Sequence, residues 1–185
     1  NTTMNFNNFT IKSQEAIQHA FQIAQGNNQQ AIETGHVLKG LNHSAENVIG
    51  FLLKKLSVNI TIFQQALDKI IQSYPKVSGG EQYLSSTANR ALQKALGLAQ
   101  EMGDQYVSVE HILLALLEAK DSVSHLMKDN GMTKKDLKLA IEELRKGSKV
   151  DSQTAEDKFN SLNRFAINLN ERARSGKLDP VIGRD

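Results

Sequence analysis

The chain has 185 residues, with 22 lysines and arginines against 20 aspartates and glutamates, so its formal net charge is only +2. It contains no cysteine, which excludes disulfides, thiolate metal sites and a cysteine nucleophile. With 2 prolines, 5% aromatic residues and no clear alternating runs, the sequence predicts an all-α protein.

Four helices are predicted in the first half of the chain from apolar residues at helical spacing. The first begins at Thr10, whose hydroxyl suits an N-cap, and it carries a stripe rich in alanine. The second begins near His36, the third after Ser44 and the fourth after Asn59. Pro75 ends the fourth helix, because the residue before a proline disfavours helical geometry.

Residues 75–85 contain a proline, a Gly-Gly pair and serines, so they are predicted to form a loop. The helical pattern of apolar residues then restarts and predicts four more helices. These begin near Ala88, Glu110, Val123 and Thr133, and the last of them ends at Gly147.

The second half of the chain repeats the first at an offset of 75 positions. The offset superimposes identical residues, among them Ala20 on Ala95, Gln25 on Gln100 and His36 on His111. We therefore predict a tandem four-helix repeat, over residues 10–74 and 86–147, within a domain of residues 4–147. Two units are too few for a solenoid, so they are expected to pack face to face as one pseudo-twofold globule of eight helices.

The composition changes after this domain. Residues 148–158 are polar and have no apolar periodicity, so they are predicted to form a linker. A new amphipathic stripe begins at Phe159 and predicts a short helix, but residues 159–185 are too few to form a core of their own. We expect them to be the truncated start of a further module.

The sequence lacks the patterns of the common catalytic and cofactor sites. It has no P-loop, no dinucleotide-binding glycine pattern, no histidine pair at the spacing of a helical zinc site and no compelling catalytic triad. The densest basic run, from Lys134 to Lys149, alternates with acidic residues and lacks interleaved aromatics, which indicates a solvated face. We therefore expect no enzyme activity, no metal, no cofactor and no nucleic-acid partner for this chain.

No membrane partner is expected either. No apolar run approaches the roughly 20 residues that span a bilayer. Residues 1–6 have neither the basic nor the apolar region of a secretory signal.

Two acidic residues of the second half have an open interpretation. Asp104 follows the glycine that ends the fifth helix, and Glu110 lies at the start of the sixth, where a carboxylate stabilises the helix dipole. Apolar residues beside helix starts, such as Tyr106, either cover the core or line an exposed peptide-binding groove.

Three stretches of sequence resemble a known family. Residues 98–111 (LAQEMGDQYVSVEH) and the opening NFNNFT at residues 5–10 are similar to the amino-terminal domain of Clp-type AAA+ unfoldases. The tail, with NLNERARSGK at residues 168–177 followed by LDPVIGRD, resembles the junction into the first ATPase module of the ClpB disaggregases more than that of the ClpC unfoldases.

This resemblance implies a substrate-engaging accessory domain of an ATP-dependent disaggregase. The full-length parent would be a cytoplasmic homohexamer that uses ATP and Mg and acts in stress response and protein refolding with a DnaK-type chaperone system. The domain is expected to bind unfolded or aggregated polypeptide weakly and to hand it to the pore. The isolated chain is expected to be mainly monomeric.

The resemblance also assigns substrate contacts. They are Thr10, Asp104 and Glu110, beside an apolar groove that we extend to Leu92, Tyr106 and Val107. A groove with carboxylates at its rim is expected to prefer apolar and basic segments.

An alternative function is an adaptor-docking or ring-regulating domain of a ClpC-like unfoldase. Exposure of Leu92 and Tyr106 in a groove would favour client binding, whereas burial would make them ordinary core residues. The repeat equivalent of Glu110 is Gly35, so the acidic element is not duplicated. Twofold-symmetric sites are therefore not expected.

Overall fold

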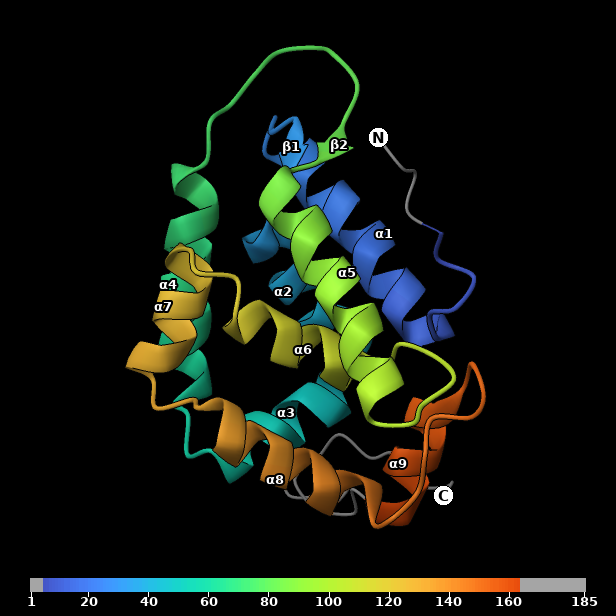
Figure 1. Cartoon of the computed structure of the whole chain (residues 1–185). Coiled ribbons are helices and arrows are strands. Elements are labelled where there is room, and N and C mark those ends of the chain that lie inside the picture. Colours follow the sequence, from blue (N-terminus) through green and yellow to red (C-terminus); the bar gives the residue numbers. More distant parts are fainter. Residues whose placement is uncertain (1–4, 164–185) are drawn as a thin grey trace, which may run out of the picture.

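The structure, a computed structural model, describes residues 5–163, and these residues confirm the predicted all-α fold. Figure 1 shows helices almost throughout the described chain. The elements are α1 (Ile11–Gly26), β1 (Ala31–Ile32), α2 (Thr34–Ser44), α3 (Glu46–Lys55), α4 (Ile60–Ser73), β2 (Tyr83–Leu84), α5 (Ser86–Glu101), α6 (Val109–Leu117), α7 (Ser122–Asp129), α8 (Lys134–Arg145) and α9 (Ala155–Asn163). The predictions made for residues 164–185 concern a part of the chain outside the described residues.

Side-chain caps fix the starts of several helices. The Thr10 hydroxyl accepts the Ser13 N–H at 3.1 Å, and its repeat equivalent Ser85 accepts the Ala88 N–H at 3.0 Å. Asn59 begins α4 in the same way. Each cap satisfies a backbone donor that the first helical turn leaves without a partner, which is why these boundaries could be predicted.

The helices pack as two repeats related by a pseudo-twofold axis. α1 contacts α6 of the other repeat, and its counterpart α5 contacts α2. Likewise α3 contacts α8, and α7 contacts α4. The two central helices, α2 and α6, contact each other, and every residue of α6 is buried. The face-to-face arrangement expected from the tandem repeat is present.

Short extended segments join the two repeats at two places that the pseudo-twofold axis relates. Leu84 of β2 pairs in parallel with Ile32 of β1, where residues 75–85 were predicted to be entirely loop. Phe9 forms a parallel bridge with Val107, which is the same pairing at the offset of 75 positions. The segment before the first helix of each repeat therefore pairs with the segment before the second helix of the other.

The predicted linker differs most from the structure. Within residues 148–158, Val150 is fully buried, and α9 begins at Ala155. Phe159 is also buried in the core. Val150 is an isolated apolar residue that produces no periodic signal, and Phe159 belongs to the predicted stripe but packs into the core of this domain. Figure 1 shows α8 and α9 together at the end of the molecule opposite β1 and β2.

Within residues 5–163, no helix is long and apolar enough to cross a membrane.

Candidate functional site

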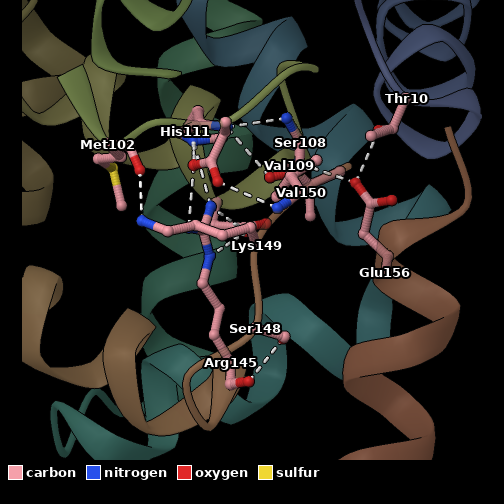
Figure 2. A network of polar contacts seen from close by, with 12 residues as sticks. Thr10, Met102, Ser108, Val109, His111, Arg145, Ser148, Lys149, Val150 and Glu156 are labelled. Carbon is pink, nitrogen blue, oxygen red and sulfur yellow. Dashed lines mark hydrogen bonds and ion pairs between the residues drawn. The ribbon is translucent and has the colours of Figure 1, made fainter. Parts of the chain in front are cut away.

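The three polar residues assigned to substrate contact come from separate elements and lie at one place. Thr10 caps α1, Asp104 follows α5, and Glu110 lies in the first turn of α6. All three belong to the buried polar residues of the structure. Figure 2 shows the network in which they take part, between the starts of α1 and α6 and the residues that follow α8.

Arg145, the last residue of α8, forms ion pairs with both carboxylates. Its guanidinium contacts Asp104 Oδ2 at 2.9 Å through Nη1 and Glu110 Oε2 at 2.9 Å through Nη2. Its Nε also donates to Glu110 Oε2 at 3.0 Å. Only 5% of Arg145 is exposed, so the guanidinium and both carboxylates form a desolvated ion cluster.

His111 completes the pairing around Asp104. The backbone N–H of Ser108 donates to His111 Nδ1 at 2.9 Å, so the ring proton lies on Nε2 and is donated to Asp104 Oδ2 at 2.8 Å. Burial raises the pKa of Asp104, but bonds from His111, the Val150 N–H and Arg145 outweigh it, so this pKa lies below its ordinary value. The carboxylate is therefore held ionised.

Glu156 joins the starts of two helices. Its Oε2 accepts the Thr10 hydroxyl at 2.7 Å and the backbone N–H of Val109, the first residue of α6, at 3.0 Å. Burial, followed by the negative charge of Glu110, raises the pKa of Glu156 to about 7. The Thr10 and Val109 donors oppose that rise without cancelling it.

A stretch of backbone between Arg145 and Glu156, which bends and turns at residues 152–154 before α9 begins at Ala155, lies across the site. The Val150 N–H donates to Asp104 Oδ1 at 3.0 Å, and the Gln105 N–H donates to the Val150 carbonyl at 2.8 Å. Further along, the Ile11 N–H donates to the Gln153 carbonyl at 2.9 Å. We call residues 149–156 the docked segment. Its main chain is bound by Asp104 and by the backbone beside the starts of α1 and α6.

The predicted apolar groove is closed in this structure. Leu92 and Val107 are 0% and 1% exposed, whereas Tyr106 is only partly buried. Leu92 lies on the inward stripe of α5, and Val107 is held by its bridge to Phe9. Burial of Leu92 and Val107 makes them core residues here, and their contact with substrate stays a prediction.

The first repeat has the same framework without the charges. His36 Nε2 donates to Gln29 Oε1 at 2.6 Å, which matches the bond from His111 to Asp104. In place of Glu110 stands Gly35, where a Cβ would collide with the Tyr74 hydroxyl. The histidine and its partner are thus present in both repeats, whereas the ion cluster is present in the second repeat and has no counterpart at Gln29 and Gly35.

Sequence reasoning missed Arg145, His111 and Glu156 as parts of the site. Arg145 was assigned to a solvated basic face because acidic residues surround it in the sequence. The repeat held a signal, because at an offset of 74 positions Arg145 falls on the buried Ile71. A charged residue at the core position of its repeat partner indicates a buried charge that needs a partner.

Two histidines far apart in the sequence lie together on another face. The rings of His19 and His43 have centroids 3.8 Å apart, and both residues line shallow surface pockets beside α1 and α2. None of the predicted site residues lines these pockets. Within residues 5–163 there is no group of three or more histidine or acidic side chains that could hold a metal ion.

Comparison with known proteins agrees with this fold. A family model described as the Clp repeat (R) N-terminal domain matches residues 8–130. The chain is 59% identical over 182 residues to the chaperone protein ClpB of Bacteroides thetaiotaomicron, covering 98% of this chain and 21% of that protein. The chain thus spans about a fifth of the length of this curated relative.

Two solved structures are also similar. The crystal structure of the Hsp104 N-terminal domain from Candida albicans has a TM-score of 0.72 and 26% identity, covering 81% of this chain and 99% of that one. A ClpV N-domain solved in complex with a VipB peptide has a TM-score of 0.63 and 16% identity, covering 77% of this chain and 92% of that one. The second likeness shows the fold alone. Because the family model matches well over half of the chain, and the structure contains its tandem helical repeat, the chain belongs to the Clp repeat N-terminal domain family.

Proposed function

We propose that the chain is the substrate-engaging accessory domain of an ATP-dependent protein disaggregase, and that it binds unfolded or aggregated polypeptide weakly at the Thr10–Asp104–Glu110 site. One observation carries the proposal. The site already holds a stretch of polypeptide through main-chain bonds to Asp104, Gln105 and Ile11. Main-chain recognition suits a domain whose clients share no sequence.

The identity of the relatives supports the same function. The chaperone ClpB of Bacteroides thetaiotaomicron is 59% identical to this chain. The ClpV N-domain, which has the same fold, was solved with a VipB peptide, so the fold is compatible with peptide binding. Binding at one small site is expected to be loose, and several copies in a ring would raise the effective concentration of sites.

The charges of the site alter the client chemistry expected from the sequence. Arg145 pairs with both Asp104 and Glu110, so neither carboxylate is free to select basic clients while that cluster stands. The proposal therefore rests on backbone recognition beside apolar surface rather than on attraction of basic segments.

Activities of the longer protein extend the proposal. We propose that the parent is a cytoplasmic homohexameric AAA+ ATPase that uses ATP and Mg, cooperates with a DnaK-type chaperone system and receives clients from this domain at its pore. This chain would have no enzyme activity, because its sequence has no P-loop. The isolated chain would be monomeric.

A binding assay with repeat-matched variants tests the site. Thr10→Ala and Asp104→Asn are expected to weaken binding of a fluorescent, permanently unfolded polypeptide several-fold, measured by anisotropy. Their repeat equivalents, Ser85→Ala and Gln29→Ala, serve as controls because they alter the same framework in the uncharged repeat. Equal affinities for all four variants and the unaltered chain would reject the site, provided that circular dichroism shows each variant folded.

A second candidate function is docking of a folded adaptor, or regulation of the ring, as in a ClpC-like unfoldase. The burial of Leu92 and Val107 favours it, because a closed groove offers clients little apolar surface. This candidate predicts no binding of unfolded polypeptide and selective binding of one folded partner, so the same anisotropy assay distinguishes the two.

A further inference from the structure

The site proposed for clients is covered by the chain itself. The docked segment takes the Asp104 oxygen and the Gln105 and Ile11 amides, and Glu156 takes the Thr10 hydroxyl and the Val109 amide. An incoming polypeptide that used these groups would meet them already bonded. Client binding at this place therefore requires the segment to leave.

The docked segment has a specific chemistry. Val150 is fully buried, and Glu156, six positions later, places its carboxylate on two donors. The Val109 N–H has no hydrogen-bond partner within α6, and the helix dipole at this end favours a negative group. The segment thus contributes main-chain groups, two buried apolar side chains, Val150 and Ala155, and one carboxylate.

The buried carboxylates weaken the docking at the Glu156 end of the segment. Glu156 and Glu110 are both buried and repel each other, and Arg145 is shared between Asp104 and Glu110. Glu110 Oε1 accepts no hydrogen bond from any described residue. Three buried carboxylates, with one guanidinium that contacts only two of them, favour a contact that can be broken.

The repeat provides a comparison for this arrangement. Ser85, the counterpart of Thr10, caps its own helix at Ala88. The Gln29 side chain, the counterpart of Asp104, donates to the Ile71 carbonyl at 2.6 Å within its own repeat. The fold is complete there with neutral groups, whereas in the second repeat Asp104 contacts both Arg145 of α8 and the Val150 N–H of the docked segment.

We propose that residues 149–156 are a displaceable internal ligand of the Thr10–Asp104–Glu110 site, and that the site takes segments in which a turn separates an apolar residue from an acidic one about six positions later. This inference rests on the proposed function for the identity of the natural competitor, an unfolded client. The segment blocks the site when docked, and a client of this pattern replaces it.

Glu156→Ala in the full 185-residue chain is the direct test. The variant is expected to lose protection from hydrogen exchange at the Gln105 and Ile11 amides, which bond the segment. It should also bind a synthetic peptide of residues 148–163 about tenfold or more tightly than the unaltered chain does, because apparent affinity scales with the fraction of open sites. Asp157→Ala, which removes a neighbouring exposed carboxylate, is the matched control.

Competition separates the possible outcomes. The peptide should displace a permanently unfolded polypeptide from the Glu156→Ala chain, whereas a scrambled peptide should not. If the segment is released but the peptide neither binds nor competes, the internal-ligand proposal is wrong while client binding stands. If no form of the chain binds the polypeptide, the proposed function fails, and peptide binding alone then decides the inference.

A second variant covers the case in which Glu156→Ala leaves the segment protected. Adding Val150→Asp places a charge in a buried apolar position next to Asp104 and should release the segment. Continued protection of the Gln105 and Ile11 amides in the folded double variant would overturn the proposal.

Discussion

At the scale of single residues, the site depends on one guanidinium. Arg145 is the cation that contacts both Asp104 and Glu110, and all three groups are desolvated. Burying a charge without its partner is far more costly than forming the pair is favourable. The cluster is therefore a point at which the stability of the domain is sensitive to a single substitution.

Arg145→Met keeps a long side chain but removes the charge. It is expected to lower the free energy of unfolding by about 3–5 kcal/mol, because it leaves buried carboxylates uncompensated. Urea denaturation measures the loss. Lys135→Met, the same charge change at an exposed position of α8, should stay within about 0.5 kcal/mol. Equal stabilities of the two variants would contradict the buried ion cluster.

The pKa of Glu156 predicts how docking depends on pH. This pKa is raised from 4.5 to about 7 in the docked form, so between those values the docked segment holds a proton that the released segment lacks. Docking is therefore strongest at the acid end of this window and weakens as pH rises through about 7. Glu110 is the charged group that faces Glu156, and Asp104 stays ionised across the window because its pKa is below the ordinary 3.8.

Protection factors of the Gln105 and Ile11 amides, corrected for intrinsic exchange, test this dependence. They should be higher near pH 5.5 than near pH 7.5, and Glu156→Gln should remove the difference. Asp157→Asn should keep it. His36, whose pKa burial lowers to about 4, acts with the opposite sign, so the amides of α2 around His36 should show the opposite pH dependence.

At the scale of elements, the two repeats differ in how closely their first two helices approach. Gly40 of α2 faces α1, and a Cβ there would collide with the backbone carbonyl of Ala16. Its counterpart in α6 is Ala115. The first repeat therefore requires a glycine where the second accepts a methyl group.

Gly40→Ala is expected to destabilise the chain by about 1–3 kcal/mol, because backbone must shift to admit the methyl group. Gly50→Ala, in α3, meets open space and should instead stabilise by up to about 1 kcal/mol through helix propensity. Thermal unfolding of the two variants compares them directly. Shifts of the same sign would contradict the close packing of α1 on α2.

How far the sequence predicts this structure also differs by element. Helix starts at Thr10 and Asn59 were predictable, because capping is a local signal that a few residues carry. The parallel pairing of β1 with β2 was not, since it joins short segments far apart in the chain. The docked segment was missed for the same reason. Val150 and Phe159 fill places that only the folded bundle creates.

The candidate site was predicted in part. Family resemblance named Thr10, Asp104 and Glu110, and the structure places them in one polar network, while their contact with substrate stays a prediction. It gave no account of their burial, which depends on Arg145 and Glu156 from outside the matched motif. The asymmetry between Glu110 and Gly35 was visible in the aligned repeats, and the structure gives its meaning as a charged cluster present in one repeat.

At the scale of the whole molecule, the pseudo-twofold bundle is a rigid support for one asymmetric site. The pairing of α1 with α6 and of α5 with α2 fixes the starts of α1 and α6, from which the site donors come. The docked segment, which covers the site, follows α8 and leads into α9. Binding of a client is thus expected to change the packing of α9, into which the docked segment leads.

The most direct test of the account is a nuclear magnetic resonance titration of the 185-residue chain with a permanently unfolded, apolar-rich polypeptide. Client binding that displaces the docked segment should shift the Thr10, Gln105 and Val109 amides and remove the docked-segment contacts at Val150. Absence of shifts at saturating polypeptide, or shifts confined to the neutral counterparts Ser85 and Gln29, would contradict it.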